Sequence, residues 1–277
     1  MGAIKKVYLQ VYFFVMALYV FFNKGIAYSF FAEILWAMGF ILLFLTRKEF
    51  AFGWDKRTKI LAFFLVITVG YIGWGLRAYT PFDVIRDSFV FQYGWFAFFM
   101  FMFKDLQEQI WKYIILIFTW FPWFALLNFY FQNFSEFFET FILFGSVPFA
   151  LYKYGDMGVN LLISSLVLLL YLNHRSMRFQ VAMAVAILLN LLIITAYSRS
   201  GMVAYLIGLG LFVWLTKQEA MRVLIKQYLR YLPIVLLIVL PLYASIKVKE
   251  NFQGRKVGME QLVENVGSIF GVSKDAT

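Results

Sequence analysis

The sequence predicts an all-α protein: a polytopic transmembrane helix bundle of about nine spans, with its amino terminus in the cytoplasm. First, 63% of the residues are hydrophobic and only 14% are charged, whereas soluble domains have roughly 45–50% apolar and about 25% charged residues. The mean hydropathy is correspondingly high, at +0.78. Second, several apolar runs approach the ~20 residues that cross a bilayer as a helix. Third, lysines and arginines gather between alternate runs, as they do in cytoplasmic loops.

Nine apolar segments are expected to cross the membrane. In chain order they cover about 7–22, 26–45, 60–76, 88–103, 113–131, 157–172, 179–197, 199–216 and 231–246. Pro122 should kink the fifth span. Phenylalanines recur at helical spacing within 132–156, which predicts an amphipathic helix at the interface. Residues 217–230 are expected to form a basic amphipathic loop.

The distribution of basic residues sets the orientation. With the amino terminus inside, fifteen lysines and arginines fall in cytoplasmic segments, and only five fall in the short outer segments: Lys24, Arg77, Arg86, Lys153 and Arg199. A further span at 137–152 would place the later basic loops outside, against the positive-inside rule. The expected organisation is therefore a transmembrane helical domain over 1–246, followed by the start of a large external (periplasmic) loop over 247–277.

Several classes of site are not expected from the composition. The chain has no cysteine and a single histidine, so disulfides and thiolate catalysis are excluded, and His174 leaves little scope for a metal site. His174 is expected to be a solvated loop residue. The net charge of +10 fits cytoplasmic loops better than a nucleic-acid partner. We therefore expect no metal, no cofactor and no nucleic acid.

The turn between the seventh and eighth spans combines residues suited to an anion. Ser198 or Ser200 can cap the eighth helix, and the positive end of the helix dipole favours negative charge there. The Arg199 guanidinium matches a phosphate in bidentate geometry. Gly201 permits close approach of a ligand or of backbone. The turn is thus a candidate phosphate clamp; alternatively, it is an ordinary hairpin whose arginine reaches the lipid headgroups.

A second outer loop carries Arg77 and Arg86 beside Asp83 and Asp87. Together with Arg199, these arginines would suit a pyrophosphate on a lipid carrier. Alternatively, the loop is a solvated interfacial helix, because Asp83 and Arg86 are spaced to form an ion pair within it.

Polar and small residues inside the spans also predict contacts. Glu33 lies well inside an apolar span and is either part of a proton or cation pathway or a glutamate buried between helices. Asn128 and Asn190 are expected to form hydrogen bonds between helices. Ala204 and Gly208 form a small-residue face for helix contact.

The turn Thr195-Ala196-Tyr197-Ser198-Arg199-Ser200-Gly201, between two apolar helices, resembles the O-antigen ligase/polymerase superfamily of membrane glycosyltransferases. The earlier outer loop, with Pro81, Asp83 and Arg86, also agrees with this family. So do Lys153-Tyr154-Gly155-Asp156 before a span, and the helix pair that opens into an external segment. The resemblance covers most of the 277 residues.

This resemblance implies transfer of a glycan from an undecaprenyl-pyrophosphate donor to lipid A-core or a similar acceptor. The reaction would take place at the external face of the bacterial inner membrane. Arg199, with Arg86 or Arg77, would bind the pyrophosphate beside Ser198 and Ser200, and no metal would be needed. In family members, the large external loop carries a histidine that is proposed as general base. Further spans follow that loop. We therefore expect this chain to be an amino-terminal fragment, inactive alone, with no catalytic residue assigned.

Three alternatives remain open. An O-antigen or polysaccharide polymerase of the same superfamily would use the same donor. A transporter or flippase of lipid-linked glycan would use Glu33 in a cation path, although no internal repeat is seen. A non-catalytic scaffold fragment is the third.

Overall fold

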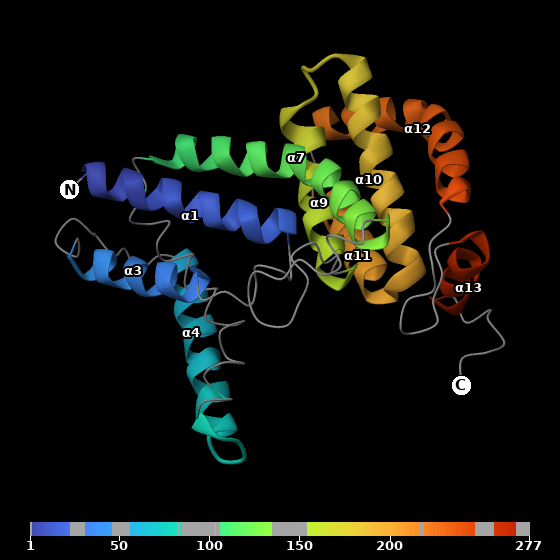
Figure 1. Ribbon diagram of the computed structural model, residues 1–277. Helices are drawn as coiled ribbons and strands as arrows, with labels where there is room; N and C mark the ends of the chain where they lie inside the picture. The colour runs from blue at the N-terminus through green and yellow to red at the C-terminus, as the bar shows by residue number, and fades with distance from the viewer. Residues whose placement is uncertain are drawn as a thin grey trace. The chain divides into compact units, whose positions relative to one another are not determined.

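In the computed structural model of the chain, the residues that it describes form α-helices joined by short turns (Figure 1). These residues are 2–22, 31–45, 56–81, 84, 103, 106–134, 154–215, 219–246 and 258–269. No β-strand occurs among them. The predicted all-α class is therefore confirmed.

The helices are α1 (Gly2–Phe22), α3 (Phe31–Leu45), α4 (Lys56–Gly75), α7 (Gln107–Phe134), α9 (Tyr154–Tyr171), α10 (Met177–Tyr197), α11 (Arg199–Leu215), α12 (Glu219–Ser245) and α13 (Met259–Ile269). The predicted fourth span, apart from Phe103, and most of the predicted interfacial helix over 132–156 lie outside the described residues. The loop predicted over 217–230 is wrong from Glu219 onward, because α12 already begins there. The first residues of α12 contain neither glycine nor proline and include several strong helix formers.

Four helical segments in the described residues are long and apolar enough to cross a membrane. They are Gly2–Phe22, Gln107–Phe134, Met177–Tyr197 and Tyr228–Ser245. Shorter apolar helical segments cover Leu65–Gly75, Met157–Tyr171 and Ser200–Leu215. These helices indicate a membrane protein. The hydrocarbon of a bilayer offers no hydrogen-bond partners, and a helix satisfies its backbone N–H and C=O groups by itself.

The chain divides into two compact units. Unit 1 comprises residues 1–16 and 30–112, and unit 2 comprises residues 17–29 and 113–277. Helices α1 and α7 contribute residues to both units. Each unit is described by itself.

Unit 1 is held by aromatic and backbone contacts. The Tyr8 hydroxyl of α1 donates a hydrogen bond to the Leu35 carbonyl oxygen of α3 at 3.1 Å. The rings of Tyr8 and Phe103 stack with centroids 5.9 Å apart. At the end of α4, Gly75 lies against Val84, where a Cβ would come within 3.1 Å of a Val84 methyl carbon. Glycine therefore allows the chain to fold back closely after α4.

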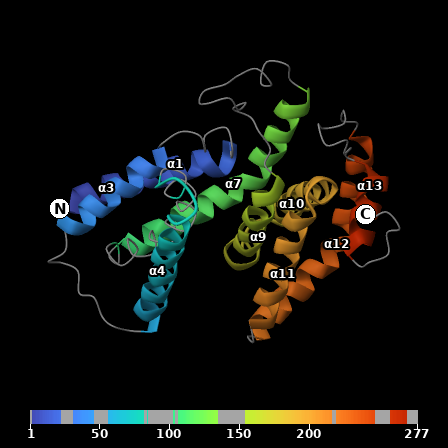
Figure 2. The ribbon, with the colours of Figure 1, turned by 90° about the horizontal axis from the view of Figure 1, so that it is seen from below.

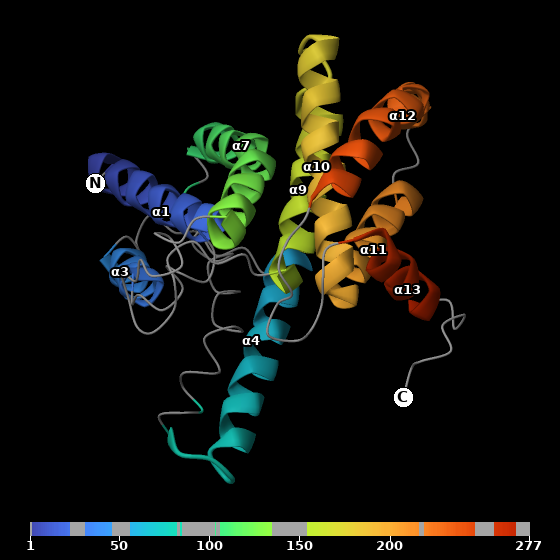
Figure 3. The same ribbon diagram turned by 45° about the vertical axis from the view of Figure 1, so that its right-hand side comes forward.

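Unit 2 is built around α9 and α10. Helix α9 packs against both α10 and α11, and α10 also packs against α12 and α13. Figures 2 and 3 show α9, α10 and α11 side by side. A Cβ at Gly208 of α11 would meet the end of the Leu162 side chain of α9. Gly208 therefore lies directly against α9, and the predicted helix contact at this residue is confirmed.

Two buried asparagines join helices of unit 2. Asn190 of α10 donates a hydrogen bond to the Pro122 carbonyl oxygen of α7 at 2.8 Å and another to Ala186 of its own helix at 2.8 Å. Asn128 of α7 donates to the Phe21 carbonyl oxygen of α1. Both predictions of interhelical hydrogen bonds are confirmed. Helix α7 is bent (Figure 3), as its internal Pro122 predicts.

Replacing Asn190 with leucine should lower the free energy of unfolding by about 1–2 kcal/mol, because the bond between α10 and α7 is lost. The measurement is reversible unfolding of the purified protein in mixed detergent micelles. Asn133→Leu is the matched control, since the Asn133 side chain donates to Phe129 of its own helix. Equal losses for the two variants would contradict the assigned role of Asn190.

Candidate functional site

The chain reverses direction between α10 and α11 at a single residue. Helix α10 ends at Tyr197 and α11 begins at Arg199, so only Ser198 lies between them, in an extended conformation (φ −144°, ψ 102°). Its backbone N–H donates to the Ile194 carbonyl oxygen at 2.7 Å, which closes α10. Its hydroxyl oxygen accepts the Gly201 backbone N–H at 3.3 Å, which caps α11.

Two hydroxyls meet at this turn. The hydroxyl oxygens of Ser198 and Ser200 lie 3.0 Å apart and share a hydrogen bond. Ser200 is exposed and Ser198 is half-buried. A ligand at the amino end of α11 would therefore meet two polar side chains that are already oriented by each other.

Helix α9 supports the turn from behind. Gly158, near the start of α9, is buried against the backbone of Gly201, and a Cβ at position 158 would collide with the Gly201 carbonyl oxygen. The close approach predicted at Gly201 is therefore made by α9. This contact fixes the amino end of α11 against a second helix.

Helix α13 completes the turn through Asn265. This side chain is 1% exposed, and its amide nitrogen donates to the carbonyl oxygens of Thr195 and Ala196 at 2.8 and 2.9 Å. The Gln261 side chain donates to the Asn265 amide oxygen at 3.4 Å. The Tyr243 hydroxyl, near the end of α12, donates to the Gly258 carbonyl oxygen just before α13 at 3.2 Å. Asn265 thus satisfies carbonyl groups that the last turn of α10 leaves free.

Helix α13 is not predicted from the sequence, because the polar composition of residues 247–277 indicates an external loop. A signal was present nonetheless. Met259, Leu262, Val263, Val266 and Ile269 recur at the spacing of one helical face. The contact of Asn265 with α10 depends on the tertiary fold and has no such signal.

The amino end of α11 carries positive partial charge, and the carboxyl end of α10 beside it carries negative partial charge. Hydrogen bonds satisfy groups at both ends: Asn265 donates to carbonyl oxygens of α10, and the Ser198 hydroxyl accepts the Gly201 N–H of α11. The first turn of α11, which is entirely within the described residues, contains no acidic residue. Instead, it begins with Arg199, whose positive charge adds to that of the helix dipole. An anion bound at this point would be stabilised by both.

The structure brings together two of the five predicted site residues. Ser198 and Ser200 lie in the turn, and Arg199 is the first residue of α11. The side chain of Arg199 lies outside the described part of the chain. Arg86 also lies outside it. Arg77 is exposed in unit 1, where its guanidinium carbon lies 5.8 Å from the centroid of the Trp74 ring. This is a cation–π contact.

Other chemistry-bearing groups do not gather at the turn. Within the described residues, no three His, Asp or Glu side chains lie close enough to hold a metal ion. His174 is exposed between α9 and α10, at the other end of α10 from Ser198. The Glu33 side chain lies outside the described residues.

Comparisons with protein-family models, with curated proteins and with solved structures give no match to this chain. The function must therefore be inferred from the site itself.

Replacing Gly158 with alanine should destabilise unit 2 by about 1–3 kcal/mol, because the added methyl group collides with rigid backbone at Gly201. The matched control is Gly210→Ala in α11, where a Cβ meets nothing within 4 Å and alanine favours the helix. Thermal unfolding in detergent measures both variants. A Gly158→Ala protein as stable as the Gly210→Ala protein would exclude the close contact.

Proposed function

We propose that this protein is a membrane glycosyltransferase of the O-antigen ligase type. It transfers a glycan from an undecaprenyl-pyrophosphate donor to lipid A-core or a similar acceptor, at the external face of the bacterial inner membrane. The single observation that carries the proposal is the turn at Ser198. There, Ser198 caps the amino end of α11, Gly158 packs against Gly201, and Asn265 donates to carbonyl oxygens at the end of α10.

The groups at this turn fit a phosphate. The hydroxyls of Ser198 and Ser200 are 3.0 Å apart and share a hydrogen bond; in the proposal, both turn to the ligand and donate to oxygens of one phosphate group. In the proposal, the Arg199 guanidinium binds a third oxygen or the second phosphate in bidentate geometry. The predicted role of Arg86 and Arg77 as additional cations for the donor stays a prediction from the sequence.

The reaction needs charge stabilisation more than covalent help. An acceptor hydroxyl oxygen attacks the anomeric carbon of the donor sugar, and the bond from that carbon to the pyrophosphate oxygen breaks. Negative charge then develops on the leaving pyrophosphate, where the Arg199 guanidinium and the N–H groups at the amino end of α11 would stabilise it. The proton leaves the acceptor hydroxyl for a base that is not assigned among the residues of this chain.

The other candidates differ from this proposal in the acceptor or in the fate of the donor. A polymerase of the same superfamily would use the same turn and pass the glycan to another repeat unit. A flippase would move the lipid-linked glycan unchanged. In proteoliposomes, loss of lipid flux in Glu33→Gln together with unaltered pyrophosphate binding in Arg199→Gln would favour the flippase.

The orientation can be tested directly, because the chain contains no cysteine. Ser200→Cys, in the exposed turn, should react with a membrane-impermeant maleimide added to intact cells. Ser176→Cys is the matched control, since Ser176 is exposed just before α10, at the opposite end of that helix from the turn. It should react only after the cells are opened. The reverse labelling pattern would place the turn in the cytoplasm and exclude an external pyrophosphate site.

Arg199→Gln should weaken binding of undecaprenyl pyrophosphate roughly tenfold to hundredfold, as expected for the loss of charge-assisted hydrogen bonds. Binding of this lipid to the full chain in detergent provides the measurement. Lys112→Gln removes the same charge from a side chain that is already paired with Glu108 at 2.7 Å, and it should leave the affinity nearly unchanged. Equal affinities of the Arg199→Gln and Lys112→Gln proteins would show that the turn does not bind the donor.

A further inference from the structure

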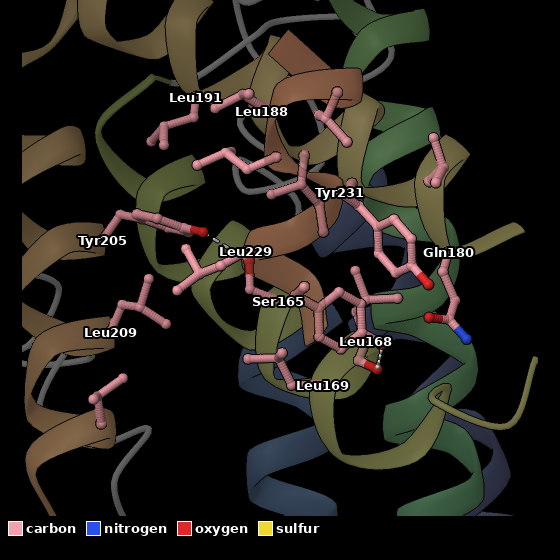
Figure 4. Close-up of a pocket in the computed structure, with 17 residues that line it drawn as sticks. Ser165, Leu168, Leu169, Gln180, Leu188, Leu191, Tyr205, Leu209, Leu229 and Tyr231 are labelled. Atoms are coloured by element: carbon pink, nitrogen blue, oxygen red, sulfur yellow. Dashed lines mark hydrogen bonds between the residues drawn. The ribbon is translucent and has the colours of Figure 1, made fainter. Parts of the chain in front are cut away.

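A second feature of unit 2 lies away from the turn: a cavity of about 280 Å³ enclosed by α9, α10, α11 and α12 (Figure 4). Its walls are mainly aliphatic and include Leu168, Leu188, Leu191, Leu209 and Leu232. Apolar cavities of about 150 Å³ already hold a guest the size of benzene. The cavity is therefore large enough for part of a hydrocarbon chain.

Four of the five polar side chains in the wall are bonded to the protein itself. The hydroxyls of Ser165 and Tyr205 lie 2.9 Å apart, and the Tyr228 hydroxyl donates to the Leu168 carbonyl oxygen at 3.3 Å. The Gln180 side chain donates to the carbonyl oxygens of Asn173 and Arg175 at 2.9 and 2.7 Å. Because the donors of these four side chains are already used and the rest of the wall is mainly aliphatic, the wall favours an apolar guest.

The cavity opens sideways between α11 and α12. Helix α11 packs on α9 and α10, whereas α12 packs on α10, and α11 and α12 make little contact with each other in the described residues. The wall residues at this opening are partly exposed: Val213 of α11 by 44%, and Leu229 and Leu232 of α12 by 57% and 41%. In a membrane protein, this lateral opening faces the hydrocarbon of the bilayer.

The length of the cavity matches one leaflet. Along α10 its wall runs from Gln180 to Leu191, which is about 17 Å at 1.5 Å per residue. Half of a bilayer's hydrocarbon core is about 15 Å thick. One acyl chain, entering from the headgroup region near the start of α10, would therefore lie along the cavity.

Basic side chains are exposed at the end of the cavity where that headgroup would lie. Arg175 lies just before α10, and its backbone carbonyl oxygen accepts a hydrogen bond from the Gln180 side chain. Arg178 lies in the first turn of α10. Arg230 lies in α12, between two residues that line the cavity. All three are exposed, and none forms an ion pair with a residue of the described segments. Their charge is complementary to an anionic phosphate headgroup.

We propose that unit 2 binds an anionic phospholipid, with one acyl chain in the cavity between α11 and α12 and its headgroup phosphate at Arg175, Arg178 and Arg230. This site lies at the opposite end of α10 from the Ser198 turn. It does not depend on the proposed glycosyltransferase function, and either can fail without the other.

The test is a titration of the detergent-solubilised full chain with phosphatidylglycerol or phosphatidylcholine, read out as bound lipid by native mass spectrometry. Phosphatidylglycerol should bind more tightly than phosphatidylcholine. Val213→Trp, which fills the cavity mouth, should weaken phosphatidylglycerol binding roughly tenfold, because the indole displaces buried methylenes. Leu211→Trp is the matched control, since Leu211 is 49% exposed on the same helix and does not line the cavity; it should have no effect.

The headgroup is tested separately by Arg175→Gln, Arg178→Gln and Arg230→Gln. Each should lower the affinity for phosphatidylglycerol about fivefold and leave that for phosphatidylcholine unchanged. Equal effects of Val213→Trp and Leu211→Trp, or equal binding of the two phospholipids, would overturn the proposal. Displacement of phosphatidylglycerol by undecaprenyl pyrophosphate in a manner sensitive to Val213→Trp would also overturn it, because the cavity would then hold the tail of a glycan donor.

Discussion

The turn between α10 and α11 depends on hydrogen bonds that satisfy two helix ends separated by one residue. So abrupt a reversal leaves carbonyl oxygens of one helix and N–H groups of the next close together. Ser198 serves both ends, through its N–H to Ile194 and its hydroxyl to Gly201, and Asn265 supplies two further donors to α10. Without these bonds, polar backbone groups would be buried unsatisfied, at a cost of about 1–3 kcal/mol each.

The same bonds determine the electrostatics of the site. Two adjacent helix ends of opposite sign oppose each other, and the donors to α10 offset part of its negative end. Arg199, the first residue of α11, is positively charged. An anion such as a pyrophosphate would be stabilised by this charge and by the amino end of the helix. The opposite end of α10 carries Arg175 and Arg178 outside an apolar cavity, an arrangement suited to a lipid of the other leaflet.

The features predictable from sequence are those with a local cause. Asn128 and Asn190 stand in apolar runs where a polar side chain must find a partner, and Ser198 stands where one apolar run ends and another begins. Asn265 was missed because its partners, Thr195 and Ala196, lie about seventy positions earlier in the chain. The cavity was missed because it arises where α11 and α12 fail to pack, which no local pattern encodes. The roles of Arg86 and Arg199 stay predictions, because their side chains lie outside the described residues.

The central claim is that the amino end of α11 binds a lipid-linked pyrophosphate. Its most direct test is an experimental structure of the full chain in lipid nanodiscs with undecaprenyl pyrophosphate bound. Pyrophosphate density is expected within hydrogen-bonding distance of the Ser198 and Ser200 hydroxyls, with the Arg199 guanidinium turned toward it. Pyrophosphate density elsewhere, with the Ser198 turn unoccupied, would show that this turn is not the donor site.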